Sequence, residues 1–113
     1  MKLAMMVRFL LLAAVVLAVS GVTVAAAPRA DEIIVAIIDS GMDDDLPQLV
    51  DRALPGRNFR EGTMDIKDLV GHGTFMAGLI ATSDNVRILP LKVTDENGAA
   101  RVHDVAAAIR YAV

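Results

Sequence analysis

The chain has 113 residues, which is enough for one domain at most. It contains no cysteine, which excludes disulfides and thiolate metal sites, and its formal net charge of −3, without any basic run, argues against nucleic acid as a partner. Hydrophobic residues make up 55% of the chain, and much of that share lies at the amino terminus.

The amino terminus has the pattern of a secretory signal peptide. Lys2 and Arg8 supply a short positive region, residues 9–19 form an unbroken apolar run, and the small side chains before and at Ala27 suit a cleavage site. This order of charge, apolar run and small residues predicts that the chain is exported.

The boundary of this segment depends on whether it is cleaved. We expect residues 1–26 to be removed as a signal peptide and residues 27–113 to be secreted. A membrane anchor is the alternative, because residues 9–27 contain no charge and a spanning helix needs roughly 18 apolar residues. On either interpretation residues 27–113 lie on the exported side, and an uncleaved signal segment is the only expected contact with a membrane.

The first predicted strand is residues 33–39, IIVAIID. Six consecutive apolar residues rich in Ile and Val predict a strand buried on both faces, as in a parallel sheet. Ser40 and Gly41 end this strand. The following stretch, residues 43–56, reads as a polar turn with one helical turn at most, because proline and glycine close it.

The rest of the chain alternates between strand and helix patterns. We expect a short strand around residues 58–59, a helix over 75–81, a strand over 86–93 and an amphipathic helix over 102–113 that lacks a good N-cap residue. Pro90 counts against the second long strand, because proline cannot donate to a sheet ladder. The alternation predicts an α/β fold with a parallel sheet and flanking helices.

Two residues stand where such a sheet usually carries its site. Asp39 closes the first strand, and ligands of open parallel sheets bind beyond the carboxyl ends of the strands. His72 lies between Gly71 and Gly73 where a loop becomes a helix. Alone, Asp39 reads as a turn or loop residue and His72 as a structural histidine. In this order they favour a shared site.

The two motifs together resemble those of the subtilisin-like serine proteases, the subtilases. DSG begins at Asp39, GHGT with His72 follows 33 residues later, and the family has its Asp and His motifs in this order before its Ser motif. The resemblance covers residues 33–113 and implies a subtilisin-like three-layer α/β fold. It also implies a monomeric serine endopeptidase acting on polypeptides.

The resemblance assigns roles to the residues of the two motifs. Asp39 would orient and stabilise the imidazole, and His72 would be the general base for an acyl-transfer nucleophile. Gly71 and Gly73 would leave room for substrate and backbone beside the ring.

The nucleophile expected from the resemblance has no counterpart in the sequence. The serines are Ser20, Ser40 and Ser83, and none lies in a GTS motif that opens a helix. We therefore expect residues 27–113 to be the amino-terminal part of a peptidase domain, with an incomplete fold and no activity alone. The alternative is a non-catalytic exported pseudoenzyme or binding module.

No metal or other cofactor is expected. Calcium is common in the family, but Gln48 stands where an aspartate often helps to bind it, and the loop with further ligands is missing between residues 81 and 86. Residues 43–45 are three consecutive aspartates that could hold a cation. Consecutive side chains point in different directions, so we expect a solvated loop there.

A phospho-acceptor signalling domain is a further, weaker alternative. Such a domain also has a parallel sheet with acids at strand ends and a lysine such as Lys92. Predicted export and the GHGT motif count against it. The second histidine, His103, falls on the polar face of the last predicted helix, and we expect it to be an exposed surface residue.

Overall fold

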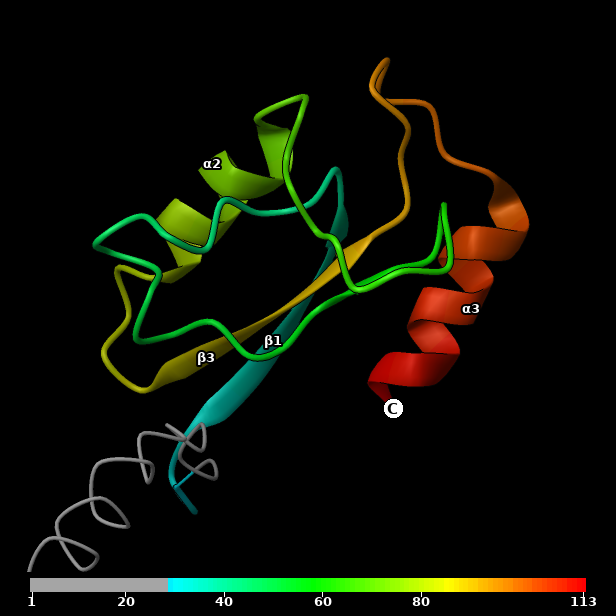
Figure 1. Cartoon of the computed structure of the whole chain (residues 1–113). Coiled ribbons are helices and arrows are strands. Elements are labelled where there is room, and N and C mark those ends of the chain that lie inside the picture. Colours follow the sequence, from blue (N-terminus) through cyan, green and yellow to red (C-terminus); the bar gives the residue numbers. More distant parts are fainter. Residues whose placement is uncertain (1–28) are drawn as a thin grey trace, which may run out of the picture.

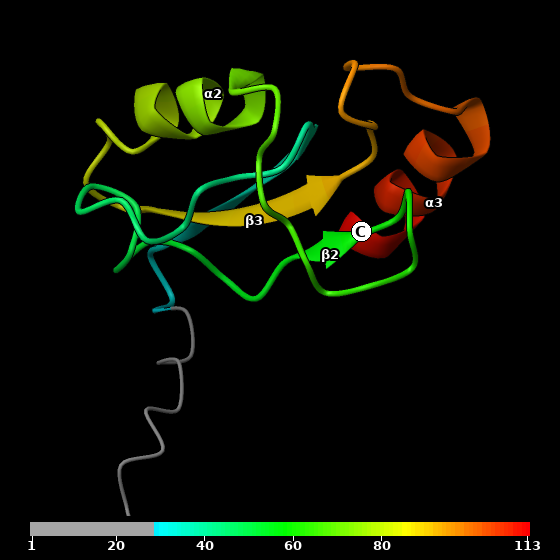
Figure 2. The same ribbon diagram turned by 45° about the horizontal axis from the view of Figure 1, so that its top comes forward.

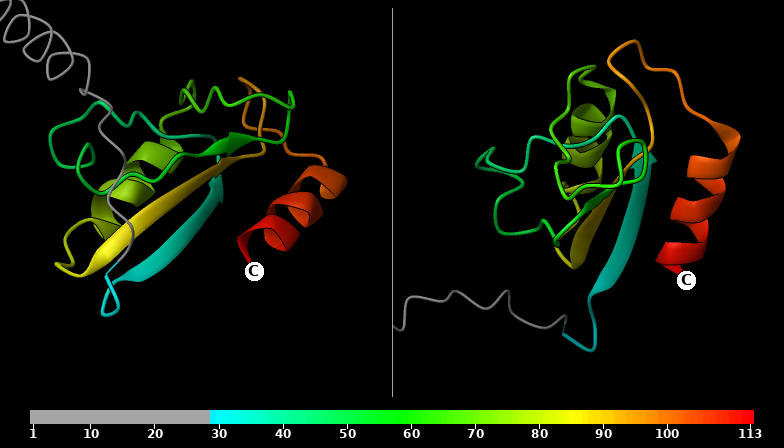
Figure 3. Two further views of the ribbon diagram at one scale, coloured as in Figure 1. Left: turned by 60° about the horizontal axis from the view of Figure 1, so that its bottom comes forward. Right: turned by 45° about the vertical axis from the view of Figure 1, so that its right-hand side comes forward.

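In the computed structural model, which describes residues 29–113, a parallel sheet carries one helix on each face (Figure 3). The predicted signal segment lies outside the described residues. Within 29–113, no helix is long and apolar enough to cross a membrane. The elements in chain order are β1 (Ile33–Asp39), β2 (Arg57–Asn58), α2 (His72–Ile80), β3 (Val86–Lys92) and α3 (Val102–Ala112).

The sheet has the order β1-β3-β2, and all its pairings are parallel; Figure 2 shows the short β2 beside β3. The register of β1 and β3 runs from Ile33 opposite Val86 to Asp39 opposite Lys92. Parallel strands end at the same edge, so Asp39 and Lys92 lie together at the carboxyl edge (Figure 1). The predicted α/β class with a parallel sheet and flanking helices is confirmed.

Pro90 is accommodated inside β3 by an irregularity in the neighbouring chain. The N–H of Ile88 donates to Arg52 O, and the C=O of Ile88 accepts from Leu54 N–H. Residues two apart in a strand direct their backbone groups to the same side, so the nitrogen of Pro90 also faces the segment that contains Arg52 and Leu54. In this segment Ala53 pairs with Ile88 and Arg57 pairs with Leu91. The segment therefore has one residue more than β3 between the two pairings, in the region of Pro90. The missing N–H of proline therefore falls where the ladder is already interrupted.

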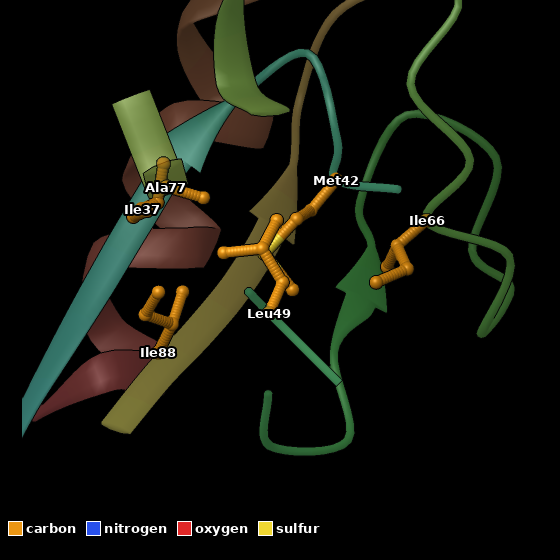
Figure 4. Packing of buried hydrophobic residues seen from close by; sticks show 6 residues of the cluster. All are labelled: Ile37, Met42, Leu49, Ile66, Ala77 and Ile88. Atoms are coloured by element: carbon orange, nitrogen blue, oxygen red, sulfur yellow. The ribbon is translucent and has the colours of Figure 1, made fainter. Parts of the chain in front are cut away.

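The two faces of the sheet have separate cores. On the α2 face the buried side chains come from both long strands, from α2 and from the connecting segments. They are Ile37, Met42, Leu49, Ile66, Ala77 and Ile88, and Figure 4 shows them with α3 behind the strands. On the opposite face α3 contributes Ala108, which packs with Leu91 of β3 and with Val93, the residue after β3. Successive strand residues alternate between these cores, as the pleat requires.

The structure departs from the sequence-based prediction in two elements. β1 was expected to be buried on both faces, but Ile33 and Ile34 are 57% and 47% exposed. The amino-terminal end of β1 extends beyond both helices, which explains this exposure (Figure 1). Residues 43–56 were expected to be a polar turn; they do form turns, but Leu49 within them is completely buried in the α2-face core.

The boundaries of the shorter elements differ by a few residues from those expected. α2 begins at His72, three residues earlier than predicted. β2 ends at Asn58, although Phe59 N–H still donates to Lys92 O at 2.8 Å. Arg101, the N-cap residue of α3, makes no side-chain capping bond, as the sequence suggested.

Candidate active site

β1 fixes Asp39 on the α2 face of the sheet. Val35 and Ile37 pack into the α2-face core, so Asp39, two residues further on, points to the same side. Its backbone oxygen accepts a hydrogen bond from Val93 N–H at 2.9 Å, and its Oδ1 accepts one from Ser40 N–H at 2.7 Å. Backbone and side chain of Asp39 are therefore both held at the carboxyl edge.

α2 brings His72 to this carboxylate. His72 is the first residue of α2, and its Nδ1 lies 2.9 Å from Oδ1 and 2.8 Å from Oδ2 of Asp39. The imidazole is 62% exposed, whereas the Asp39 side chain is 21% exposed. The structure thus places the two sequence-predicted site residues in direct contact, although they are 33 positions apart.

This contact determines what the imidazole can do. An ionised carboxylate only accepts hydrogen bonds, so a neutral imidazole paired with it carries its proton on Nδ1 and keeps the lone pair on Nε2. Nε2 has no hydrogen-bond partner in residues 29–113, and the ring faces solvent. The arrangement can accept a proton at Nε2 from another group while Asp39 stabilises the resulting imidazolium.

The two glycines beside His72 are required for different structural reasons. An added Cβ at Gly73 would come well within 3.0 Å of the carbonyl oxygen of Gly41, so α2 and the end of β1 touch through their backbones. Gly71 has a φ of +91°, which side chains rarely adopt, and open space beside it. Gly73 therefore makes room for the chain's own backbone.

The sequence analysis missed Asp68, a buried residue in the loop before α2. Its Oδ1 accepts hydrogen bonds from the N–H groups of Val70 and Gly71, at 3.1 and 2.8 Å. Its Oδ2 accepts from Thr74 N–H at 2.8 Å and from Thr74 Oγ1 at 2.7 Å. Asp68 thereby satisfies the N–H groups of Gly71 and Thr74 at the start of α2, where Gly71 offers no side-chain cap.

The hydrogen bonds of Asp68 outweigh the effect of its burial on the pKa. Burial raises the pKa of this carboxyl, but the Thr74 hydroxyl, the backbone N–H groups of Gly71 and Thr74, and the Ser40 hydroxyl lower it to about 2. Asp68 is therefore ionised throughout the physiological range. Its negative charge also lies favourably at the amino-terminal end of a helix.

The serines of the described part of the chain are not placed to act as the nucleophile. Ser40 is buried, and its Oγ accepts a hydrogen bond from Gly73 N–H at 2.9 Å. Ser83 lies in the turn after α2, where its N–H donates to Ile80 O at 3.1 Å. The site as described consists of an orienting carboxylate and a base.

The remaining candidate residues lie elsewhere or have other partners. Asp44 and Asp45 are exposed, and within residues 29–113 no group of three or more His, Cys, Asp or Glu side chains could hold a metal ion. Whether the protein needs a cofactor stays a prediction. Lys92 is buried, and its Nζ donates to Lys67 O at 2.6 Å.

The histidine of α3 is exposed, as predicted, but its neighbour is not. The side chain of His103 is 72% exposed, whereas that of Asp104 is 5% exposed. Arg101 Nε donates to Asp104 Oδ2 at 2.6 Å, and this bond is the main cause of a lowered pKa for Asp104. The expected polar face of α3 therefore contains one buried carboxylate, which is paired with the exposed Arg101.

Fold and site together define a class: α/β proteins with a carboxylate–imidazole pair at the carboxyl edge of a parallel sheet. A model of the subtilase family matches residues 30–113. The chain belongs to the subtilase family, and this membership argues against the phospho-acceptor alternative.

Known relatives agree with this membership. The chain is 37% identical over 93 residues to the intracellular serine protease of Paenibacillus polymyxa, a match covering 70% of this chain and 28% of the relative. It is 32% identical over 97 residues to the cell wall-associated protease of Bacillus subtilis strain 168, covering 74% of this chain and 11% of that protein. A crystal structure of a cold-adapted subtilisin-like serine proteinase matches with a TM-score of 0.64 and 25% identity, over 76% of this chain and 34% of that one. The chain thus spans less than a third of each curated relative.

Proposed function

We propose that this chain supplies the carboxylate and the general base of a subtilisin-like serine endopeptidase, with Asp39 and His72 as its catalytic residues. The observation that carries the proposal is the contact of His72 Nδ1 with both oxygens of Asp39 at 2.8 and 2.9 Å, with Nε2 left open to solvent. Serine protease relatives make a polypeptide the expected substrate.

The proposed chemistry uses each nitrogen of the ring once. A serine hydroxyl would give its proton to Nε2 of His72 while its oxygen attacks the scissile carbonyl carbon. Asp39 would hold Nδ1–H and stabilise the imidazolium until the same proton passes to the leaving amine. Since the Ser40 hydroxyl is buried and bonded to Gly73 N–H, and Ser83 lies in the turn after α2, we propose that a serine outside residues 29–113 supplies the attacking oxygen.

A chimeric protease tests this proposal. Residues 30–113 would replace the matching segment of the Paenibacillus polymyxa protease, whose remaining chain would contribute the missing part of the domain. We expect a fluorophosphonate probe to label the chimera and not the 113-residue chain alone. His72→Ala and Asp39→Asn should each lower peptide hydrolysis by about 10^4-fold or more, a size known from subtilisin and chymotrypsin-type enzymes.

His103→Ala is the matched control for the loss of a histidine. His103 is exposed on α3 and lies outside the pair, so turnover of the chimera should stay at the parent level. A folded chimera that is neither labelled nor active would favour a non-catalytic pseudoenzyme or binding module. A chimera that depends on His103 but not on His72 would refute the assigned base.

We propose further that residues 1–26 are a cleaved signal peptide and that residues 27–113 are secreted. Relatives include both intracellular and cell wall-associated proteases, so the support comes from the charge, the apolar run and the small residues of the amino terminus. Expression in a secreting host, followed by amino-terminal sequencing, should find a chain that begins near Ala27. Intact Met1 in a membrane fraction would establish the anchor instead.

A further inference from the structure

Asp68 is hydrogen-bonded to both structural parts that meet at the Asp39–His72 pair. Towards α2, its carboxylate accepts from Gly71 N–H, Thr74 N–H and Thr74 Oγ1 within 2.7–2.8 Å. Towards β1, its backbone N–H donates to Asp43 Oδ1 at 3.4 Å, and the hydroxyl of Ser40, the residue after Asp39, helps to lower its pKa.

Two hydroxyls extend this connection. The Thr74 hydroxyl donates to Asp68 Oδ2 and accepts from Asp43 N–H at 3.1 Å. The Ser40 hydroxyl accepts from Gly73 N–H at 2.9 Å and contributes to the lowered pKa of Asp68. An acceptor at Asp68 therefore orients the Thr74 hydroxyl, and each of the two hydroxyls joins the start of α2 to the segment that follows β1.

The exposed ring of His72 cannot be held by packing. Its side chain is 62% exposed, and its bond to Asp39 depends on where the backbone places it. The N–H groups on either side of His72 are fixed: Gly71 N–H by Asp68, and Gly73 N–H by Ser40. Both fixed groups belong to the Asp68 network.

We propose that Asp68 is a positioning residue that holds the start of α2 against the end of β1 and thereby sets the hydrogen bond between His72 and Asp39. The inference rests on the proposed function, because it assigns the geometry of the same pair. Asp68 does not contact the imidazole and acts through Gly71, Thr74 and Ser40.

The role requires a carboxylate and not merely a polar side chain of the same shape. Four donors from the loop and α2 converge on the two oxygens of Asp68. In Asp68→Asn one oxygen becomes an NH2 group, which would face donors instead of accepting from them. One side of the network would lose its acceptor, with the desolvated donors left unpaired.

The test is NMR spectroscopy of the full 113-residue chain and its variants. An imidazole Nδ1–H bonded to a carboxylate gives a proton signal far downfield, and the ring 15N shifts report the tautomer. We expect the parent chain to show this His72 signal and Asp39→Asn to lack it. Asp68→Asn should weaken or abolish the signal, while the methyl signals of Leu49 and Ile88 stay at their parent positions and prove that the core is folded.

Asp65→Asn is the matched control. Asp65 lies three residues before Asp68 in the same loop, is exposed, and its carboxylate accepts from the N–H of Lys67 at 3.0 Å. The substitution removes the same charge without touching α2, so the His72 signal should be unchanged. Equal loss in Asp65→Asn and Asp68→Asn would overturn the inference, because the effect would then be one of net charge.

The outcomes separate this inference from the proposed function. A parent chain without the downfield signal would refute the Asp39–His72 pair itself. A parent chain with it, and an Asp68→Asn variant that keeps it at full intensity, would refute only the positioning role. Should Asp68→Asn not fold, Thr74→Val removes one of the hydroxyls from the network, and an unchanged His72 signal in that folded variant would overturn the inference.

Discussion

The same substitution, glycine to alanine, should have opposite effects at two positions of α2. At Gly73, an added Cβ would lie well within 3.0 Å of Gly41 O and 3.2 Å from the Gly41 carbonyl carbon and nitrogen. At Gly78, five residues further along the same helix, no atom other than those of the adjacent residues and of the helix's own backbone lies within 4 Å of the added Cβ. Both positions therefore have a helical backbone, but only Gly78 has room for an added Cβ.

The expected cost at Gly73 follows from what the Cβ meets. The overlapping atoms belong to the backbone of Gly41 and cannot rotate away, so α2 and the end of β1 must separate by roughly 1 Å. Overpacking of this kind lowers the free energy of unfolding by about 1–3 kcal/mol, and the better helix propensity of alanine offsets about 1 kcal/mol of this loss. We expect Gly73→Ala to lower the free energy of unfolding by about 2 kcal/mol, since the obstacle is rigid.

At Gly78 only the helix propensity changes. Gly78→Ala should raise the free energy of unfolding by up to about 1 kcal/mol, because alanine loses less backbone entropy in the helix. Urea denaturation of the full chain, followed by circular dichroism, measures both variants, and with a slope of about 1–3 kcal/mol per molar their midpoints should differ by about 1 M or more. Two variants that shift in the same direction would refute the close contact of Gly73 with Gly41.

Two further predictions concern stability. The pKa of Asp68 is about 2 in the folded chain against an ordinary 3.8, so its contribution is complete above about pH 4 and is lost as the pH falls towards 2. The ionised Asp68 contributes about 2 kcal/mol to the free energy of unfolding. In Asp68→Asn the free energy of unfolding should therefore fall less steeply between about pH 4 and pH 2, and the fall that remains comes in part from Asp95 and Asp104, whose pKa values are also lowered. Leu49→Ala should cost about 2–5 kcal/mol in urea denaturation because Leu49 is fully buried, whereas Val102→Ala, at 86% exposure, should change little; equal effects would contradict the core.

The strands and the candidate pair could be predicted because their signals are local. An uninterrupted apolar run predicts β1, and its terminal acid predicts a residue at the carboxyl edge. Two motifs in a fixed order then join Asp39 to His72, which the structure places in contact. The helical spacing of apolar residues likewise predicts α3, with its start at Val102.

Asp68 and Leu49 could not be predicted in the same way, because their roles depend on contacts across the chain. The bonds of Asp68 reach Thr74 in α2 and Asp43 after β1, and only folding brings these groups together. A signal was present in the sequence: α2 starts after Gly71 with no capping side chain, so an acid a few residues upstream was a candidate to satisfy its N–H groups. Leu49 looked like one apolar residue in a polar turn.

The location of the contacts around His72 follows from what a general base needs. An imidazole that takes a proton from another group must leave Nε2 open, so the ring cannot be enclosed by side chains. Its position must then come from the backbone on either side, and the network of Asp68 together with the Gly73–Gly41 contact acts there. Substitutions at these backbone contacts should therefore disturb the Asp39–His72 bond more than changes at Phe75, which is on the same helix but 64% exposed.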